Sequence, residues 1–227
     1  MQLLFPAPAP VTLPVQGSDA RFPVRRVYCV GRNYAEHARE FGHDPDREPP
    51  FFFMKPADTL RSDGIFPYPP QSQDVHYEIE LALMIGTGGH DIPEAQASAH
   101  IFGYATALDM TRRDLQAVAK KAGRPWEAAK SFDHSAPVTA IVPADQAGDL
   151  TGSAITLSVN GALRQQARIG DMIWSAPGIV AQLSTLFELF PGDVILTGTP
   201  AGVGAVVPGD VMEGRIDGLP VLTVTVA

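Results

Sequence analysis

The chain has 227 residues, and 45% of them are apolar, which is an ordinary share for a globular protein. This length is sufficient for one sizeable core, so we expect a single main domain. A formal net charge of −8 and a pI of about 5.1 argue against nucleic acid and anionic membranes as partners. No apolar run reaches the ~18 residues of a membrane helix, and a lone cysteine makes no internal disulfide, so we expect a cytoplasmic protein.

The first part of the chain differs in composition from the remainder. Residues 1–23 are rich in proline and alanine, and a regular pattern begins only at Val24. We therefore predict an irregular or edge-strand arm over 1–23 and one domain over 24–227. The next predicted elements are a strand over 24–31, a short helix over 33–41, a strand over 51–54 and a proline-rich loop over 58–73.

Strands dominate the later part of the chain. Residues 155–159 and 162–166 flank Asn160-Gly161, a pair that suits the two positive-φ positions of a type I′ hairpin. The best amphipathic helix spans 176–189. Because strands and helices do not alternate, the pattern indicates an α+β fold built on a mixed, curled sheet or roll. Other predicted elements are strands over 78–86, 101–110 and 221–226, a charged helix over 111–122, and Pro-Gly-Asp turns at 191–193 and 208–210.

Three carboxylates lie in otherwise apolar strand sequence. Glu78 and Glu80 are two positions apart, so a strand places both on one face. Two like charges on a buried face are costly without a counter-ion, and a divalent cation such as Mg²⁺ accepts oxygen ligands. Asp109, near the end of the next predicted strand, supplies a third oxygen donor. The alternatives are a solvent-facing strand surface for the two glutamates and a helix N-cap for Asp109.

His37 and Glu40 have the i, i+3 spacing that places two side chains on one face of a helix. A histidine beside a carboxylate can act as a general base towards water, because the carboxylate stabilises the imidazolium. A salt-bridged pair on the surface of a short helix is the alternative. Lys55 and Lys130 are each either an exposed end of an element or a cation held in a dry pocket.

The glycine-rich segment 197–204 follows a predicted strand. It lacks the P-loop pattern, because no Lys-Ser or Lys-Thr pair follows. Its backbone N–H groups and threonine hydroxyls are suited to holding a carboxylate, and a plain tight turn is the alternative.

Six segments follow one another in the order Gly31-Arg32-Asn33-Tyr34-Ala35-Glu36-His37, Phe53-Met54-Lys55-Pro56, Glu78-Ile79-Glu80-Leu81, 108–114, Lys130-Ser131-Phe132-Asp133 and 196–204. Together they resemble the motifs of the fumarylacetoacetate hydrolase family, in the family's order, from about residue 24 to the C-terminus. Each motif alone is weak, but six in order are very specific. The short chain, Phe51-Phe52-Phe53 and Asp74-Val75-His76-Tyr77-Glu78 are most similar to the fumarylpyruvate hydrolase and acylpyruvase branch, which acts in gentisate breakdown.

The resemblance implies a mixed β roll, a homodimer, and Mg²⁺ or Mn²⁺ held by Glu78, Glu80 and Asp109. It also implies that His37 and Glu40 activate water, on a short segment that closes over the substrate. The implied reaction is hydrolysis of a carbon–carbon bond in an acylpyruvate, with fumarylpyruvate, cleaved to fumarate and pyruvate, as the closest match.

Further roles follow from the same resemblance. Lys130 is expected to stabilise the pyruvate enolate as charge develops. The other candidate contacts to the small anionic 2-oxo acid are Lys55, Arg113, Gln116 and Thr199. Oxaloacetate decarboxylases and 2-oxo acid tautomerases of the family share most of these motifs, so their chemistry stays open. A non-catalytic carboxylate-binding protein is a more distant alternative.

Overall fold

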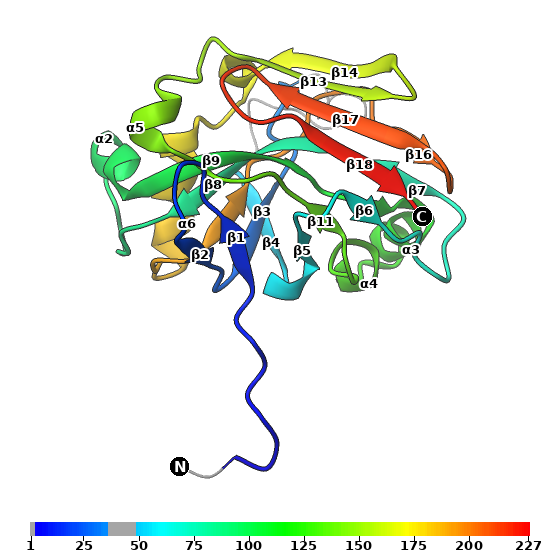
Figure 1. Cartoon of the computed structure of the whole chain (residues 1–227), viewed down its shortest axis with the longest axis horizontal. Helices are drawn as coiled ribbons and strands as arrows, with labels where there is room; N and C mark the ends of the chain where they lie inside the picture. Colours follow the sequence, from blue (N-terminus) through cyan, green and yellow to red (C-terminus); the bar gives the residue numbers. More distant parts are fainter. Residues whose placement is uncertain (1–2, 36–48) are drawn as a thin grey trace.

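The computed structural model describes residues 3–35 and 49–227 (Figure 1). A six-stranded sheet with the order β12-β9-β8-β15-β3-β4 lies at its centre. Only β15 and β3 pair in parallel, so the sheet is mixed, as predicted for an α+β fold. In the order of the sheet, the strands are Val142–Pro143, Ile101–Leu108, Ile79–Ile85, Val194–Leu196, Val27–Gly31 and Phe51–Lys55.

A second sheet of five strands, in the order β14-β13-β17-β18-β6, covers one face of the first. In Figure 1 the strands β13, β14, β17 and β18 form an upper layer over β8 and β9. The layers approach closely at Gly214, where an added Cβ would lie 2.5 Å from Ile79 Cδ1. In the order of the sheet, the strands are Ala162–Arg168, Ala154–Val159, Val211–Ile216, Leu222–Val226 and Ile65–Phe66.

Strand β8 is buried on both of its faces, because it lies between two apolar clusters. Ile79, Leu81 and Leu83 belong to the larger cluster, which fills the space between the two sheets. Ala82 and Met84 point to the opposite face, where they join a smaller cluster. The face that carries Glu80 is therefore not a solvent-facing strand surface.

The smaller elements surround these two layers. Short sheets are formed by β10-β7-β16, by β11-β5 and by the β1-β2 hairpin. Their strands are Thr111–Arg112, Val75–Tyr77, Gly204–Val206, Ala136–Pro137, Leu60–Arg61, Thr12–Pro14 and Arg21–Pro23. The described helices are η1 Ala57–Thr59, α2 Glu94–Ala97, η2 Ser98–His100, α3 Arg113–Ala122, α4 Glu127–Lys130, α5 Ala144–Ala147, η3 Ile169–Asp171 and α6 Ala176–Leu186. None of the helices in the described part of the chain is long and apolar enough to cross a membrane.

Several turns take the predicted form. Asn160 and Gly161 both have positive φ, at 52° and 78°, between the antiparallel strands β13 and β14. The two Pro-Gly-Asp turns lead into β15 and β17, as expected, with Gly192 at φ 96° and Gly209 at φ 95°.

Other elements differ from the prediction. The segment 58–73 is not loop throughout, because β5 pairs with β11 and β6 pairs with β18. The predicted helix 111–122 begins at Arg113, since its first two residues form β10. Within 1–23, the hairpin of β1 and β2 buries Leu13 and Phe22 in the smaller cluster.

A candidate metal centre in a cationic cleft

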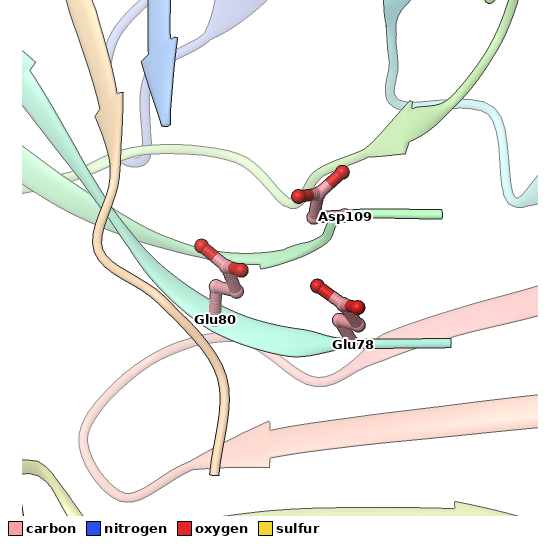
Figure 2. Close-up of side chains that lie close together, drawn as sticks. All are labelled: Glu78, Glu80 and Asp109. Carbon is pink, nitrogen blue, oxygen red and sulfur yellow. The ribbon is translucent and has the colours of Figure 1, made fainter. Parts of the chain in front are cut away.

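Three buried carboxylates meet where β8 begins and β9 ends (Figure 2). Strands β8 and β9 pair with Ile79 opposite Leu108, so Glu78 and Asp109 lie just outside the paired region. The Asp109 backbone N–H donates to the Glu78 carbonyl oxygen at 2.8 Å, which fixes this register. One carboxylate oxygen from each of Glu78, Glu80 and Asp109 lies within 4.8 Å of the other two. The pairing of the two strands thus assembles the predicted triad.

Two buried lysines neutralise part of this charge. The Lys130 ammonium donates to Glu78 Oε2 and to Asp109 Oδ2, both at 2.7 Å. Lys55 Nζ lies 2.8 Å from Asp109 Oδ1 and also contacts the Lys130 carbonyl and Ser135 Oγ. Burial alone would lower the pKa of Lys130, but Asp109 and Glu78 outweigh it and raise that pKa. Lys130 is therefore held as an ammonium ion at neutral pH.

Among the described residues, no lysine or arginine donates to the Glu80 carboxylate as Lys130 does to Glu78 and Asp109. Burial raises the pKa of Glu80 well above its ordinary value, and the charges of Asp109 and Glu78 raise it further. Its one described hydrogen bond comes from the Gly198 backbone N–H, which donates to Oε2 at 2.7 Å. A buried carboxylate between two others calls for a further cation.

The donor set fits a divalent metal ion. The buried Asp109 Oδ1 forms an ion pair with Lys55 Nζ at 2.8 Å, and a carboxylate oxygen has a second lone pair that can bind a metal ion. Three carboxylate oxygens are hard ligands of the kind that Mg²⁺ and Mn²⁺ prefer. Glu78, Glu80 and Asp109 therefore form a site that is consistent with a divalent cation, as predicted.

The triad opens into a small cleft with a volume of about 40 Å³. Of the predicted substrate contacts, Arg113, Gln116 and Thr199 line this cleft, as does Lys130. Arg113 donates to Glu78 Oε1 at 2.6 Å and to Gln116 Oε1 at 2.8 Å. Helix α3 starts four residues after Asp109, and this short connection brings its first turn over the metal site.

Lys55 does not line the cleft. It lies behind Asp109 with only 1% of its surface exposed, so its observed contacts are with the protein. The sequence left open whether this lysine is an exposed strand end or a cation in a dry pocket, and the structure shows the dry pocket.

The Thr199 side chain is held by a residue that sequence reasoning missed. Buried Gln165 of β14 donates to Thr199 Oγ1 at 2.9 Å and to the Pro200 carbonyl at 2.8 Å. Its Oε1 accepts from the Ile79 backbone N–H at 3.0 Å. One amide thus ties the 197–204 turn to the start of β8, and a polar residue in a predicted hairpin strand gave no sign of this.

The predicted water-activating pair, His37 and Glu40, lies outside the described residues. Other residues that sequence reasoning did not single out as functional also line the cleft, among them Arg32, Phe51, Phe53, Lys120 and Trp126. The sequence did contain a signal for Lys120. It lies four residues after Gln116 and seven after Arg113, which places all three side chains on one face of α3.

Comparisons with known proteins agree with this geometry. The family model described as fumarylacetoacetate (FAA) hydrolase C-terminal matches residues 26–227. The crystal structure of fumarylpyruvate hydrolase from Pseudomonas aeruginosa, in complex with Mn²⁺ and pyruvate, is 54% identical, with a TM-score of 0.97 over 100% of this chain and 99% of that one. Fumarylpyruvate hydrolase from Ralstonia sp is 45% identical over 81% of this chain and 95% of its own length.

A relative with a different activity is similarly close. Mitochondrial oxaloacetate decarboxylase of Dictyostelium discoideum is 41% identical, over 86% of this chain and 90% of its own length. The shared fold, the buried triad and these matches lead to one conclusion. The chain belongs to the fumarylacetoacetate hydrolase family.

Proposed function

We propose that this protein hydrolyses a carbon–carbon bond of an acylpyruvate, with fumarylpyruvate as the substrate and fumarate and pyruvate as the products. The observation that carries this proposal is the placement of the acidic triad in a cleft whose described lining also includes four cations. The Mn²⁺ and pyruvate complex of the 54% identical fumarylpyruvate hydrolase supports the same assignment.

The head of the substrate is a 2-oxo carboxylate, and the described residues offer matching groups. A divalent ion, when held by Glu78, Glu80 and Asp109, supplies Lewis acidity towards the oxygens of the 2-oxo acid. Gln116 and Thr199 line the same cleft and are proposed to orient the head. The Lys130 ammonium is proposed to donate to the enolate oxygen of the departing pyruvate, where negative charge grows in the transition state.

The proposed chemistry needs a base for water. His37 is assigned to take the proton of the attacking water, and Glu40 to stabilise the imidazolium that results. The water oxygen bonds to the distal carbonyl carbon, the adjacent carbon–carbon bond breaks, and its electron pair passes to the pyruvate enolate. The proton on His37 then returns to the enolate carbon, which completes pyruvate and restores the base.

The direct test follows the loss of fumarylpyruvate absorbance with added Mg²⁺, after EDTA treatment, and in a His37→Ala variant. We expect EDTA-sensitive formation of fumarate and pyruvate that His37→Ala abolishes. His90→Ala is a matched control, because His90 is exposed and pairs with Asp91 away from the described cleft residues. Full activity in His37→Ala would contradict the assigned base.

A second candidate function is decarboxylation or tautomerisation of oxaloacetate, and the oxaloacetate decarboxylase relative favours it. Neither reaction requires an attacking water, so neither needs His37 to activate one, although tautomerisation still needs a group that accepts the C3 proton. Turnover of oxaloacetate without turnover of fumarylpyruvate, under the same conditions, would keep the metal site and overturn the hydrolase proposal.

A further inference from the structure

An aromatic wall leads away from the metal site along one side of the cleft. It begins at Phe53, whose ring lies 5.4 Å from the Lys130 ammonium. The centroid of the Trp126 ring lies 6.0 Å from that of Phe53, and the centroid of the Phe51 ring lies 5.3 Å from that of Trp126. All three rings line the cleft. A flat, conjugated acyl chain has the shape and polarity to lie against such a surface.

Two cations lie over the Phe51 and Trp126 rings of this wall. The Arg32 guanidinium lies 5.2 Å from the centroid of the Phe51 ring. The Lys120 ammonium lies 5.1 Å from the centroid of the Trp126 ring. Both residues line the cleft, although they come from different parts of the fold, since Arg32 follows β3 and Lys120 lies in α3.

The charges of the cleft favour a ligand with more than one negative charge. Its described lining includes four cations, Arg32, Arg113, Lys120 and Lys130, and the three carboxylates of the triad. A divalent ion would therefore bring the net charge of these groups from plus one to plus three. Lys130 and Arg113 donate to the triad, and Arg32 and Lys120 contact the aromatic wall among their other interactions.

The other cations of the cleft also affect the pKa of Lys120. Partial desolvation, together with the charges of Arg113 and Arg32, lowers the pKa of Lys120 to about 8, although its side chain is exposed at the mouth of the cleft. Like charges held this close favour an anion between them, because a bound carboxylate relieves their repulsion. The lowered pKa of Lys120 agrees with its position over the Trp126 ring, and that position is the main evidence.

We propose that Arg32 and Lys120 bind a second carboxylate, at the distal end of the acyl chain, so that the cleft selects extended 2-oxo dicarboxylates over 2-oxo monocarboxylates. The placement of a 2-oxo head at the triad rests on the proposed function. Fumarylpyruvate has both features, a planar conjugated chain for the Phe53, Trp126 and Phe51 wall and a terminal carboxylate for the two cations.

Binding of two ligands of equal length tests this inference without any turnover. In the presence of Mn²⁺, calorimetry compares 2-oxoheptanedioate with 2-oxoheptanoate, which carries a methyl group in place of the distal carboxylate. We expect the dicarboxylate to bind about 10- to 100-fold more tightly, as is typical for charge-assisted hydrogen bonds. Arg32→Gln and Lys120→Gln should each remove most of this preference and leave the affinity for the monocarboxylate unchanged.

Lys121→Gln is the matched control, because Lys121 is the neighbouring exposed lysine of α3 and does not line the cleft. Unchanged affinity for 2-oxoheptanoate shows that each variant is folded and that its head site is intact. Equal affinities of the two ligands in the unmodified protein would overturn the inference, as would a full preference in both variants.

Fumarylpyruvate turnover separates this inference from the proposed function. If the protein turns over fumarylpyruvate but shows no preference for the dicarboxylate, the distal site is wrong and the function stands. If it shows the preference, abolished by the two variants, but no turnover, the function is wrong and the distal site stands. In an active enzyme, Lys120→Gln should also raise KM for fumarylpyruvate about tenfold and leave KM for acetylpyruvate unchanged.

Discussion

The Glu80 carboxylate destabilises the metal-free protein when it is ionised, because it is buried beside Asp109 and Glu78. The pKa of Glu80 is higher in the folded chain than in the unfolded chain, so the folded state favours the protonated carboxyl group. This stabilisation is complete below the unfolded pKa and is lost as the pH rises through the folded pKa. In EDTA, we therefore expect Glu80→Gln to gain stability relative to the unmodified protein as the pH increases from about 4 to about 8.

Thermal melting in EDTA across this pH range measures the difference. Addition of Mn²⁺ should then stabilise the unmodified protein by about 2.7 kcal/mol at 100 times Kd, and Glu80→Gln much less. The same pH dependence of melting in both proteins would contradict the assignment of the raised pKa to Glu80.

Asp109→Asn should have the opposite effect on the metal-free protein. Lys55 and Lys130 are both buried against this carboxylate, so removal of its charge leaves two ammonium groups with reduced compensation. We expect a loss of about 3–5 kcal/mol in the free energy of unfolding. Urea denaturation in EDTA measures it, with Asp91→Asn, at an exposed surface pair, as the control. Equal stability of Asp109→Asn and the unmodified protein would show that the lysines need no partner there.

At the level of single residues, the sequence predicted the metal triad and left the cations ambiguous. Glu78, Glu80 and Asp109 were recognisable because acids are rare in apolar strands. Lys120 was not, because a lysine on a charged helix is typical of a solvated surface. Only the contacts with Trp126 and the cleft distinguish it from its neighbour Lys121, and such contacts depend on how α3 packs.

The turn after β15 positions Glu80 through the backbone of Gly198. This glycine has φ of 94°, and an added Cβ would lie 2.8 Å from Asn33 Cβ, so a side chain must displace the turn. We expect Gly198→Ala to weaken Mn²⁺ binding about tenfold, because the N–H donor of Glu80 moves. Calorimetric titration with Mn²⁺ measures this change.

Gly161→Ala provides the control for backbone strain. Gly161 also has a positive φ, at 78°, but an added Cβ there would contact nothing within 4 Å. Gly161→Ala should lose about 1 kcal/mol of stability and Gly198→Ala more than that, and only Gly198→Ala should lose metal affinity. A similar loss of affinity in both would mean that general destabilisation, rather than the position of the turn, controls the metal site.

Among the elements, prediction worked best where local sequence decides the structure. The 155–166 hairpin follows from Asn160-Gly161, which alone fixes the turn type. The segment 58–73 failed because β5 and β6 are strands only through partners that lie far along the chain, in β11 and β18. For the same reason, periodicity could not show that β8 is buried on both faces, since that depends on two separate clusters.

For the molecule as a whole, stability should depend on both apolar clusters. Phe22 of the β1-β2 hairpin belongs to the smaller one, so Phe22→Ala should cost about 3–5 kcal/mol. Leu4 is 100% exposed, and Leu4→Ala should change stability by less than about 0.5 kcal/mol. Chemical denaturation distinguishes the two variants. If Phe22→Ala were as stable as Leu4→Ala, the hairpin would contribute nothing to the folded core.

The predicted homodimer stays a prediction at this scale. Light scattering of the purified protein should give about twice the chain mass of 24.2 kDa. A mass equal to that of one chain, at a concentration where the enzyme is active, would show that the family resemblance does not extend to assembly.

The strand order of the central sheet also has a consequence for folding during synthesis. Strand β15 lies between β8 and β3, but it is synthesised more than a hundred residues after both, and Gly198 is 118 residues from its acceptor Glu80. A chain still on the ribosome therefore exposes the edges of β8 and β3, which are prone to pairing with other strands. The Gly198 contact to Glu80 forms only after nearly the whole chain has emerged, whereas β8 and β9 supply the three carboxylates much earlier in synthesis.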